Sequence, residues 1–173
     1  GQPTVITMSG VNGAGKTTLL RAILGLLKPR QGRIITPFDV RPPGYVPQEK
    51  ALDPLFPVSL RQIVAMGLYP ELGLWRRPSK RQQERIDEAL EEFRLIDHQA
   101  KTFSELSGGM RQKTLLARAF VSGADVFIMD EPTSELDEET EAEVLRHLYR
   151  LSAENGKTVL IAHHGLDEIA TLA

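Results

Sequence analysis

The residues with the clearest chemical potential form a glycine-rich stretch near the start of the chain. Residues 10–17 read GVNGAGKT and match the phosphate-binding pattern G-x-x-x-x-G-K-[ST]. Glycines leave room for consecutive main-chain N–H groups to surround a polyphosphate, and the positive end of a following helix adds to the attraction. We expect Lys16 to reach the β- and γ-phosphates of a nucleoside triphosphate, Thr17 to coordinate Mg²⁺, and Thr18 to contact the α-phosphate. The predicted nucleotide-binding residues of this loop are Gly10, Asn12, Gly13, Ala14, Gly15, Lys16, Thr17 and Thr18.

An apolar segment later in the chain ends in two carboxylates. Residues 125–132 read DVFIMDEP, as expected for a buried strand with Asp130 and Glu131 at its carboxyl end. Asp130 can hold the Mg²⁺ shell opposite Thr17, and Glu131 can polarise an attacking water as a general base. A plain acidic turn is the alternative for this pair alone. The phosphate-binding loop in the same chain favours the catalytic interpretation.

These two motifs must be positioned by strands and helices that alternate along the chain, which predicts a parallel α/β sheet. Between about residues 50 and 120 the strand signal fades and helical patterns replace it, one of them following a capping serine, Ser79. The predicted fold is therefore an α/β P-loop NTPase, with a mainly parallel sheet flanked by helices and an inserted α-helical subdomain. The predicted strands are 4–9, 33–36, 44–47, 125–129 and 158–162, and the helices that flank them are 16–27 and 138–151.

Composition restricts the class of protein. The 173 residues suit one domain, and a net charge of -2 gives no bulk attraction to nucleic acid, so no nucleic-acid partner is expected. The absence of cysteine excludes disulfides and cysteine-ligated metal. No segment resembles a transmembrane helix or a signal peptide, so a membrane role would act through a partner. Because the sequence opens without Met, directly into a strand, we expect a piece of a longer protein.

Residues 106–113, LSGGMRQK, resemble the signature of the ABC ATPase family, usually LSGGQ. Without the family, this Ser-Gly-Gly turn could equally be an anion site at a helix start or an ordinary helix cap. The resemblance covers nearly the whole chain, and it divides the domain into a RecA-like core, 1–49 and 121–173, and a helical signature subdomain, 50–120. It implies ATP as the nucleotide and a head-to-tail dimer with a second copy. Ser107, Gly108 and Gly109 of one copy would then contact the ATP held by the other. Met110 departs from the usual glutamine and can weaken a contact that supports the nucleotide.

The same resemblance implies roles for three isolated residues. Gln48 looks like the Q-loop glutamine, which links the Mg²⁺ site to the helical subdomain. The resemblance implies that it is both a metal ligand and a catalytic residue. Asp137 looks like the D-loop aspartate that crosses the dimer interface, and a simple N-cap role is compatible with this. For the switch histidine we favour His164 over His163, because this choice aligns Leu166 with the family pattern Thr-His-Asp-Leu.

A finer resemblance points to the zinc/manganese/iron importer branch of ABC ATPases. It rests on residues 52–58 (LDPLFPV), 66–69 (MGLY) and 73–79 (GLWRRPS), whereas residues 133–135 are not typical of that branch. It implies import of a divalent metal ion, with a transmembrane permease and an extracytoplasmic binding protein as partners. The chain would then sit peripherally at the cytoplasmic face of the membrane. The family's adenine-stacking aromatic lies upstream of the first strand and outside this sequence.

Two other functions stay open at this point. One is a cytosolic ABC ATPase without a transporter, although such proteins usually carry tandem cassettes or a long coiled coil, and neither appears here. The other is a non-catalytic nucleotide-binding regulator. The presence of Lys16, Asp130, Glu131 and His164 argues against a regulator, because each has a role in hydrolysis within the family.

Overall fold

Four parallel strands organise the molecule. The computed structural model describes residues 4–8, 15–47, 57–73, 76–133, 136–153 and 156–162. The sheet has the order β1-β4-β3-β2 and consists of β1 (Thr4–Met8), β2 (Gly44–Val46), β3 (Val126–Asp130) and β4 (Thr158–Ala162). Every strand pair is parallel, so the carboxyl ends lie along one edge, where Met8 and Asp130 both pair with Ala162. The parallel sheet predicted from the sequence is confirmed.

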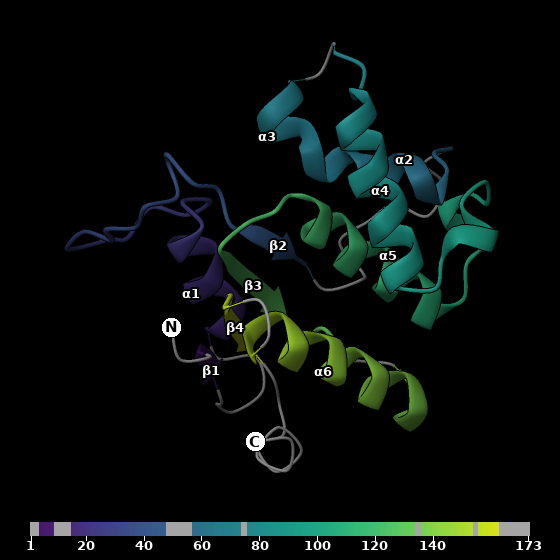
Figure 1. The fold of residues 1–173 in the computed structure, drawn as a ribbon. Helices are drawn as coiled ribbons and strands as arrows, with labels where there is room; N and C mark the ends of the chain where they lie inside the picture. Colours follow the sequence, from purple (N-terminus) through teal and green to yellow (C-terminus); the bar gives the residue numbers. More distant parts are fainter. Residues whose placement is uncertain are drawn as a thin grey trace.

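Helices cover both faces of this sheet (Figure 1). In the described ranges they are α1 (Lys16–Ile23), α2 (Leu60–Ala65), α3 (Tyr69–Leu72), α4 (Lys80–Glu92), α5 (Gly108–Val121) and α6 (Glu138–Ala153), with the 3₁₀ turns η2 (Met66–Leu68), η3 (Ile96–His98) and η4 (Phe103–Glu105). Strand side chains alternate between the faces. Ile128 therefore packs with Leu20 of α1 on one face, whereas Phe127 and Met129 join the larger core on the other, where α6 packs against β4 and β1.

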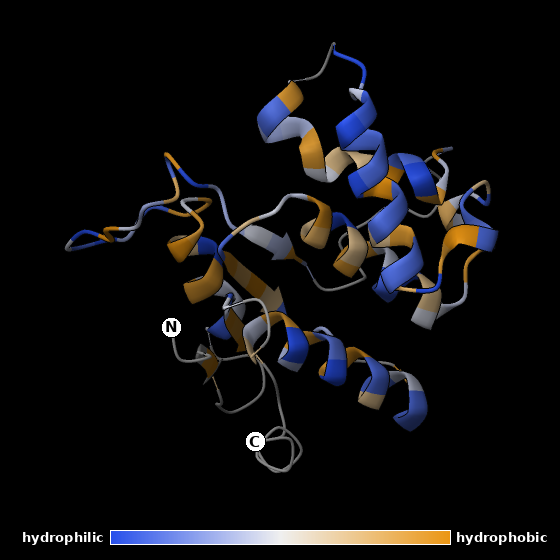
Figure 2. Cartoon of the chain, viewed as in Figure 1, coloured by the Kyte–Doolittle hydropathy of each residue, from blue (hydrophilic) through white to orange (hydrophobic). Residues whose placement is uncertain are grey.

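The middle of the chain forms a layer of helices centred on α5, which packs against α2, α4, η2 and β2. Ser59 and Ser79 each begin a helix with a capping box, as predicted for Ser79. Figure 2 shows hydrophilic residues along α4, while its buried side faces the core through Ile86 and Leu90. This layer shares one continuous core with Phe127 of the sheet. The division into subdomains at residues 50 and 120 stays a prediction.

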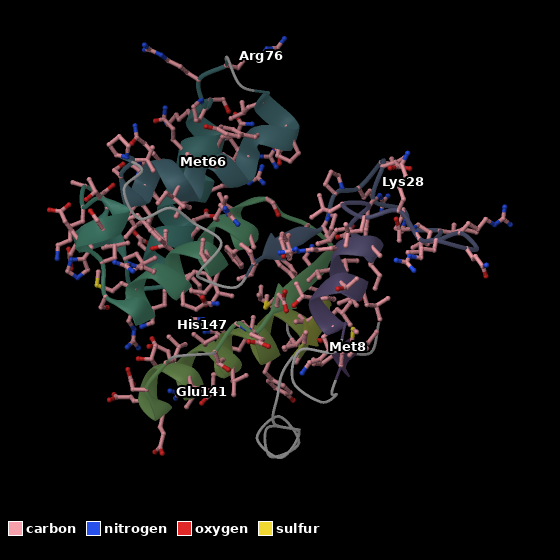
Figure 3. The ribbon with its side chains drawn as sticks, turned by 180° about the vertical axis from the view of Figure 1, so that it is seen from behind. Met8, Lys28, Met66, Arg76, Glu141 and His147 are labelled. Atoms are coloured by element: carbon pink, nitrogen blue, oxygen red, sulfur yellow. The ribbon has the colours of Figure 1, made fainter. Side chains whose placement is uncertain are left out.

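Several polar contacts join the helical layer to α6, and one of them involves His147. His147 Nδ1 lies 3.2 Å from Glu92 Oε1, and the His147 ring packs on Phe93 with centroids 4.8 Å apart. Figure 3 labels His147 where α6 faces that layer. Burial lowers the pKa of His147, against the opposing pull of the Glu92 carboxylate. This contact helps to hold the end of α4 against α6.

Two predictions about elements are wrong: one strand is absent and one helix is shorter. Residues 33–36 lie outside any strand, and Ile35 is exposed. The β-branched residues of this segment therefore do not mark a buried strand. The first helix ends at Ile23 rather than continuing to residue 27. Gly25 takes a left-handed φ of 74°, which ends the helix one turn before the proline expected to stop it.

Candidate functional site

The described part of the phosphate-binding motif lies at the start of α1. Gly15 is the N-cap, with a left-handed φ of 96° that favours glycine, and its carbonyl accepts the Leu19 N–H at 2.7 Å. Lys16, Thr17 and Thr18 form the first turn, where unpaired helical N–H groups and the positive end of the dipole favour an anion. Within the described residues, strand β1 precedes the motif and helix α1 follows it, as expected for such a loop.

Asp130 lies directly beside this turn. It ends β3 and is 2% exposed, and its Oδ1 accepts a hydrogen bond of 3.2 Å from Thr17 Oγ1. The two residues are 113 positions apart in the sequence. Because Mg²⁺ prefers hard oxygen donors, a threonine hydroxyl and a carboxylate at this separation fit a shared magnesium shell. The pair predicted as metal ligands is therefore brought together.

Glu131 turns the chain away from the sheet. Its φ is 51°, a left-handed value that is uncommon outside glycine, and its N–H donates to the Ala162 carbonyl at 2.9 Å. Holding a glutamate in this conformation costs roughly 1–3 kcal/mol. The change in backbone direction gives Asp130 and Glu131 different surroundings: the first is buried against α1, and the second is only partly buried.

The Ser-Gly-Gly turn begins α5. Ser107 is the N-cap and its Oγ accepts the Met110 N–H at 3.3 Å, while Gly108 and Gly109 are the first residues of the helix. Ser107 and Gly108 are exposed. Figure 1 shows α5 beginning on the side of the molecule away from α1. This turn therefore offers N–H groups at a helix start to a ligand approaching from outside.

Asp137 caps the start of α6. Its Oδ1 accepts the Thr140 N–H at 2.9 Å, and its Oδ2 accepts the Thr140 hydroxyl at 3.0 Å. Both bonds lower the pKa of Asp137, and the bond from the Thr140 main-chain N–H has the larger effect. The side chain is exposed, so the cap leaves it accessible to a second molecule. The N-cap geometry considered from the sequence is present.

A family model for the ABC transporter matches residues 2–134 of this chain. The chain belongs to the ABC transporter family. It carries the ATPase cassette of that family, and the predicted P-loop NTPase fold is confirmed.

Among curated ABC proteins, the chain is similar to the manganese transport system ATP-binding protein MntB of Listeria monocytogenes, at 36% identity over 93% of the chain. It is also 43% identical, over 93% of its length, to the zinc transport system ATP-binding protein TroB of Treponema pallidum. A solved putative metal-chelate type ABC transporter in an inward-facing conformation matches with a TM-score of 0.83, at 33% identity over 93% of the chain. The chain spans 69% of MntB, 62% of TroB and 63% of the solved chain.

Several predicted site residues lie outside the described residues, so their positions in this ABC cassette stay predictions. They are Gly10, Asn12, Gly13, Ala14, Gln48, His163 and His164.

The position of Tyr45 close to Asp130 was not predicted from the sequence. This residue lies on β2 with its side chain on the α1 face, and burial together with the Asp130 charge raises its pKa. Arg118 of α5 donates to the Tyr45 carbonyl at 3.3 Å, and burial lowers the pKa of that guanidinium. Strand alternation at 44–46 could have placed the side chain, but its nearness to Asp130 depends on the order of the strands.

The strained backbone at Glu131 gives a stability test in which the usual effect of glycine is reversed. In urea denaturation, the free energy of unfolding of Glu131→Gly should exceed that of Glu131→Ala by about 0.5–1 kcal/mol, because glycine relieves the left-handed conformation. At Glu138, in the first turn of α6, alanine should instead be the more stable substitution. An alanine advantage at both positions would contradict the left-handed turn.

Proposed function

We propose that this chain hydrolyses ATP as the motor subunit of an ABC importer for a divalent metal ion. The observation that carries the proposal is the 3.2 Å hydrogen bond between Thr17 and the buried Asp130, with Glu131 directly after it at the sheet edge. This arrangement unites a polyphosphate-binding helix start, a pair of metal-binding oxygens and a carboxylate that can act on water. Family membership and the metal-transport names of the relatives support the same function.

The chemistry would depend on positioning and charge. Lys16 and the main-chain N–H groups of the loop bind the β- and γ-phosphates, and Thr17 and Asp130 hold Mg²⁺. The metal, when bound, neutralises charge that develops on the phosphate oxygens. Mg²⁺ keeps several waters and is usually bound by one or two protein oxygens together with substrate phosphates, which fits a shell begun by Thr17 and Asp130.

Glu131 would orient and deprotonate the attacking water as a general base. Its partly buried side chain is separated from the buried Asp130 by the left-handed turn, so one carboxylate can serve the metal and the other the water. Gln48 and His164 would complete the site as the residues that contact Mg²⁺ and the γ-phosphate. Their roles follow from the family resemblance alone.

Two copies would pack head to tail, so that Ser107 and Gly109 of one meet the ATP held by Lys16 of the other. Support comes from the exposed signature turn at the start of α5, on the side of the molecule away from α1 (Figure 1). ATP then bridges two electropositive surfaces, and hydrolysis removes the bridge. Asp137, exposed at the start of α6, would cross the same interface.

The import function requires partners. We infer a transmembrane permease, an extracytoplasmic binding protein and a peripheral position at the cytoplasmic face of the membrane. Among the described residues, no helix has the length and apolar character needed to cross a bilayer. The names of MntB and TroB concern manganese and zinc, and they support these ions as the transported substrates.

The catalytic assignment predicts that Glu131→Gln keeps ATP binding but lowers kcat by on the order of 10²–10⁴, because an amide cannot accept the proton. Steady-state phosphate release and equilibrium nucleotide binding measure the two effects separately. Glu84→Gln, which changes an exposed carboxylate on α4, should leave both unchanged. Unaltered turnover in Glu131→Gln would contradict the assignment.

The transport assignment predicts that the full-length protein co-purifies with a membrane protein of several spanning helices. In the reconstituted complex with its binding protein, Zn²⁺ or Mn²⁺ should raise ATPase activity several-fold, whereas Ca²⁺ should not. Recovery of ribosomes or DNA in place of a membrane protein would instead indicate an ABC ATPase without a transporter.

A further inference from the structure

The first turn of α5, which follows the signature residue Ser107, lies close to the first turn of α6, which Asp137 caps. A Cβ built on Gly109 would lie 3.0 Å from Thr140 Cγ2 and 3.5 Å from Thr140 Oγ1. One helical turn further along, Lys113 Nζ and Glu143 Oε2 form a 2.5 Å ion pair. The first turns of α5 and α6 therefore lie close together, with Thr140 next to Gly109.

Thr140 also holds Asp137 at both carboxylate oxygens. Its N–H donates to Oδ1 and its hydroxyl donates to Oδ2. Asp137 is exposed, so without these bonds its carboxylate would rotate among solvated rotamers. The two branches of one side chain thus face different neighbours: the methyl is the branch nearer to the Cβ position of Gly109, and the hydroxyl donates to Asp137.

We propose that Thr140 is a positioning residue that fixes the Asp137 carboxylate relative to the signature turn, and thereby prepares one composite surface for the second copy. This inference rests on the proposed head-to-tail dimer. Ser107 and Gly109 would meet the partner's nucleotide, and Asp137 would cross the interface. A surface whose parts are already in place loses less conformational entropy on association. Thr140 needs no nucleotide contact for this effect, because it acts through Gly109 and Asp137.

Two substitutions separate the contacts made by Thr140. Thr140→Val keeps the shape and the methyl group beside Gly109 but removes the hydroxyl donor to Asp137. Thr140→Ser keeps the hydroxyl and removes the methyl. Glu143→Gln weakens the neighbouring ion pair between the same two helices without touching either turn, so it controls for a general loosening of the packing.

The experiment measures MgATP-driven dimerisation of the full-length protein by sedimentation equilibrium, with every variant in a Glu131→Gln background that preserves bound ATP. Thr140→Val should weaken the dimer up to about tenfold, the cost of ordering a freed side chain on association. Thr140→Ser should recover most of this loss. Glu143→Gln should lower the Tm and leave the dimer affinity within about twofold of the parent. Binding of ATP to the isolated monomer should be equal in all variants, because Lys16 and Thr17 are unchanged.

The outcomes distinguish this inference from the function on which it rests. A parent protein that stays monomeric with MgATP would overturn the proposed function and this inference with it. A parent that dimerises, with Thr140→Val dimerising equally tightly, would overturn the inference alone. A loss in Thr140→Val matched by an equal loss in Glu143→Gln would do the same, because it would assign the effect to helix packing.

Discussion

The hydrogen bond between the Thr17 hydroxyl and the Asp130 carboxylate is the interaction on which the rest of this site depends. It joins the first turn of α1 to the end of β3, across 113 positions of sequence. Parallel pairing makes this possible, since Asp130 and Met8 both align with Ala162 at one edge of the sheet. Strand alternation then places Asp130 on the α1 face, two residues after the buried Ile128. A shift of one residue in this register would move the carboxylate to the opposite face.

The backbone immediately after Asp130 separates the two acidic residues. A left-handed turn at Glu131, held by its N–H bond to the Ala162 carbonyl, gives two adjacent carboxylates different surroundings. The same edge of the sheet also influences Tyr45, whose pKa is raised by burial and by the Asp130 charge. Strain at Glu131 is a local cost that the paired strands around it can sustain. The site thus depends on sheet register first and on local geometry second.

Sequence reasoning succeeded where the signal is local. The order of strand, glycine turn and helix placed Lys16 and Thr17, and an apolar run placed Asp130 at the end of a strand. It failed at residues 33–36, because β-branched residues also occur in exposed segments, and at the end of α1, where Gly25 acts before the proline. The contact of Gly109 with Thr140 depends on how two helices pack, which periodicity within either helix does not determine. The roles of Gln48 and His164 remain predictions from family resemblance.

A crystal structure of the Glu131→Gln protein with MgATP would show whether Thr17 and Asp130 share one metal ion. One Mg²⁺ should lie at about 2.1 Å from Thr17 Oγ1, with the Asp130 carboxylate in the metal shell and the β- and γ-phosphates at the start of α1. A lone pair of the Thr17 hydroxyl oxygen would bind the metal, and its hydrogen can still be donated to Asp130. Nucleotide bound at another edge of the sheet, or a metal that contacts neither Thr17 nor Asp130 directly or through its water shell, would overturn this assignment.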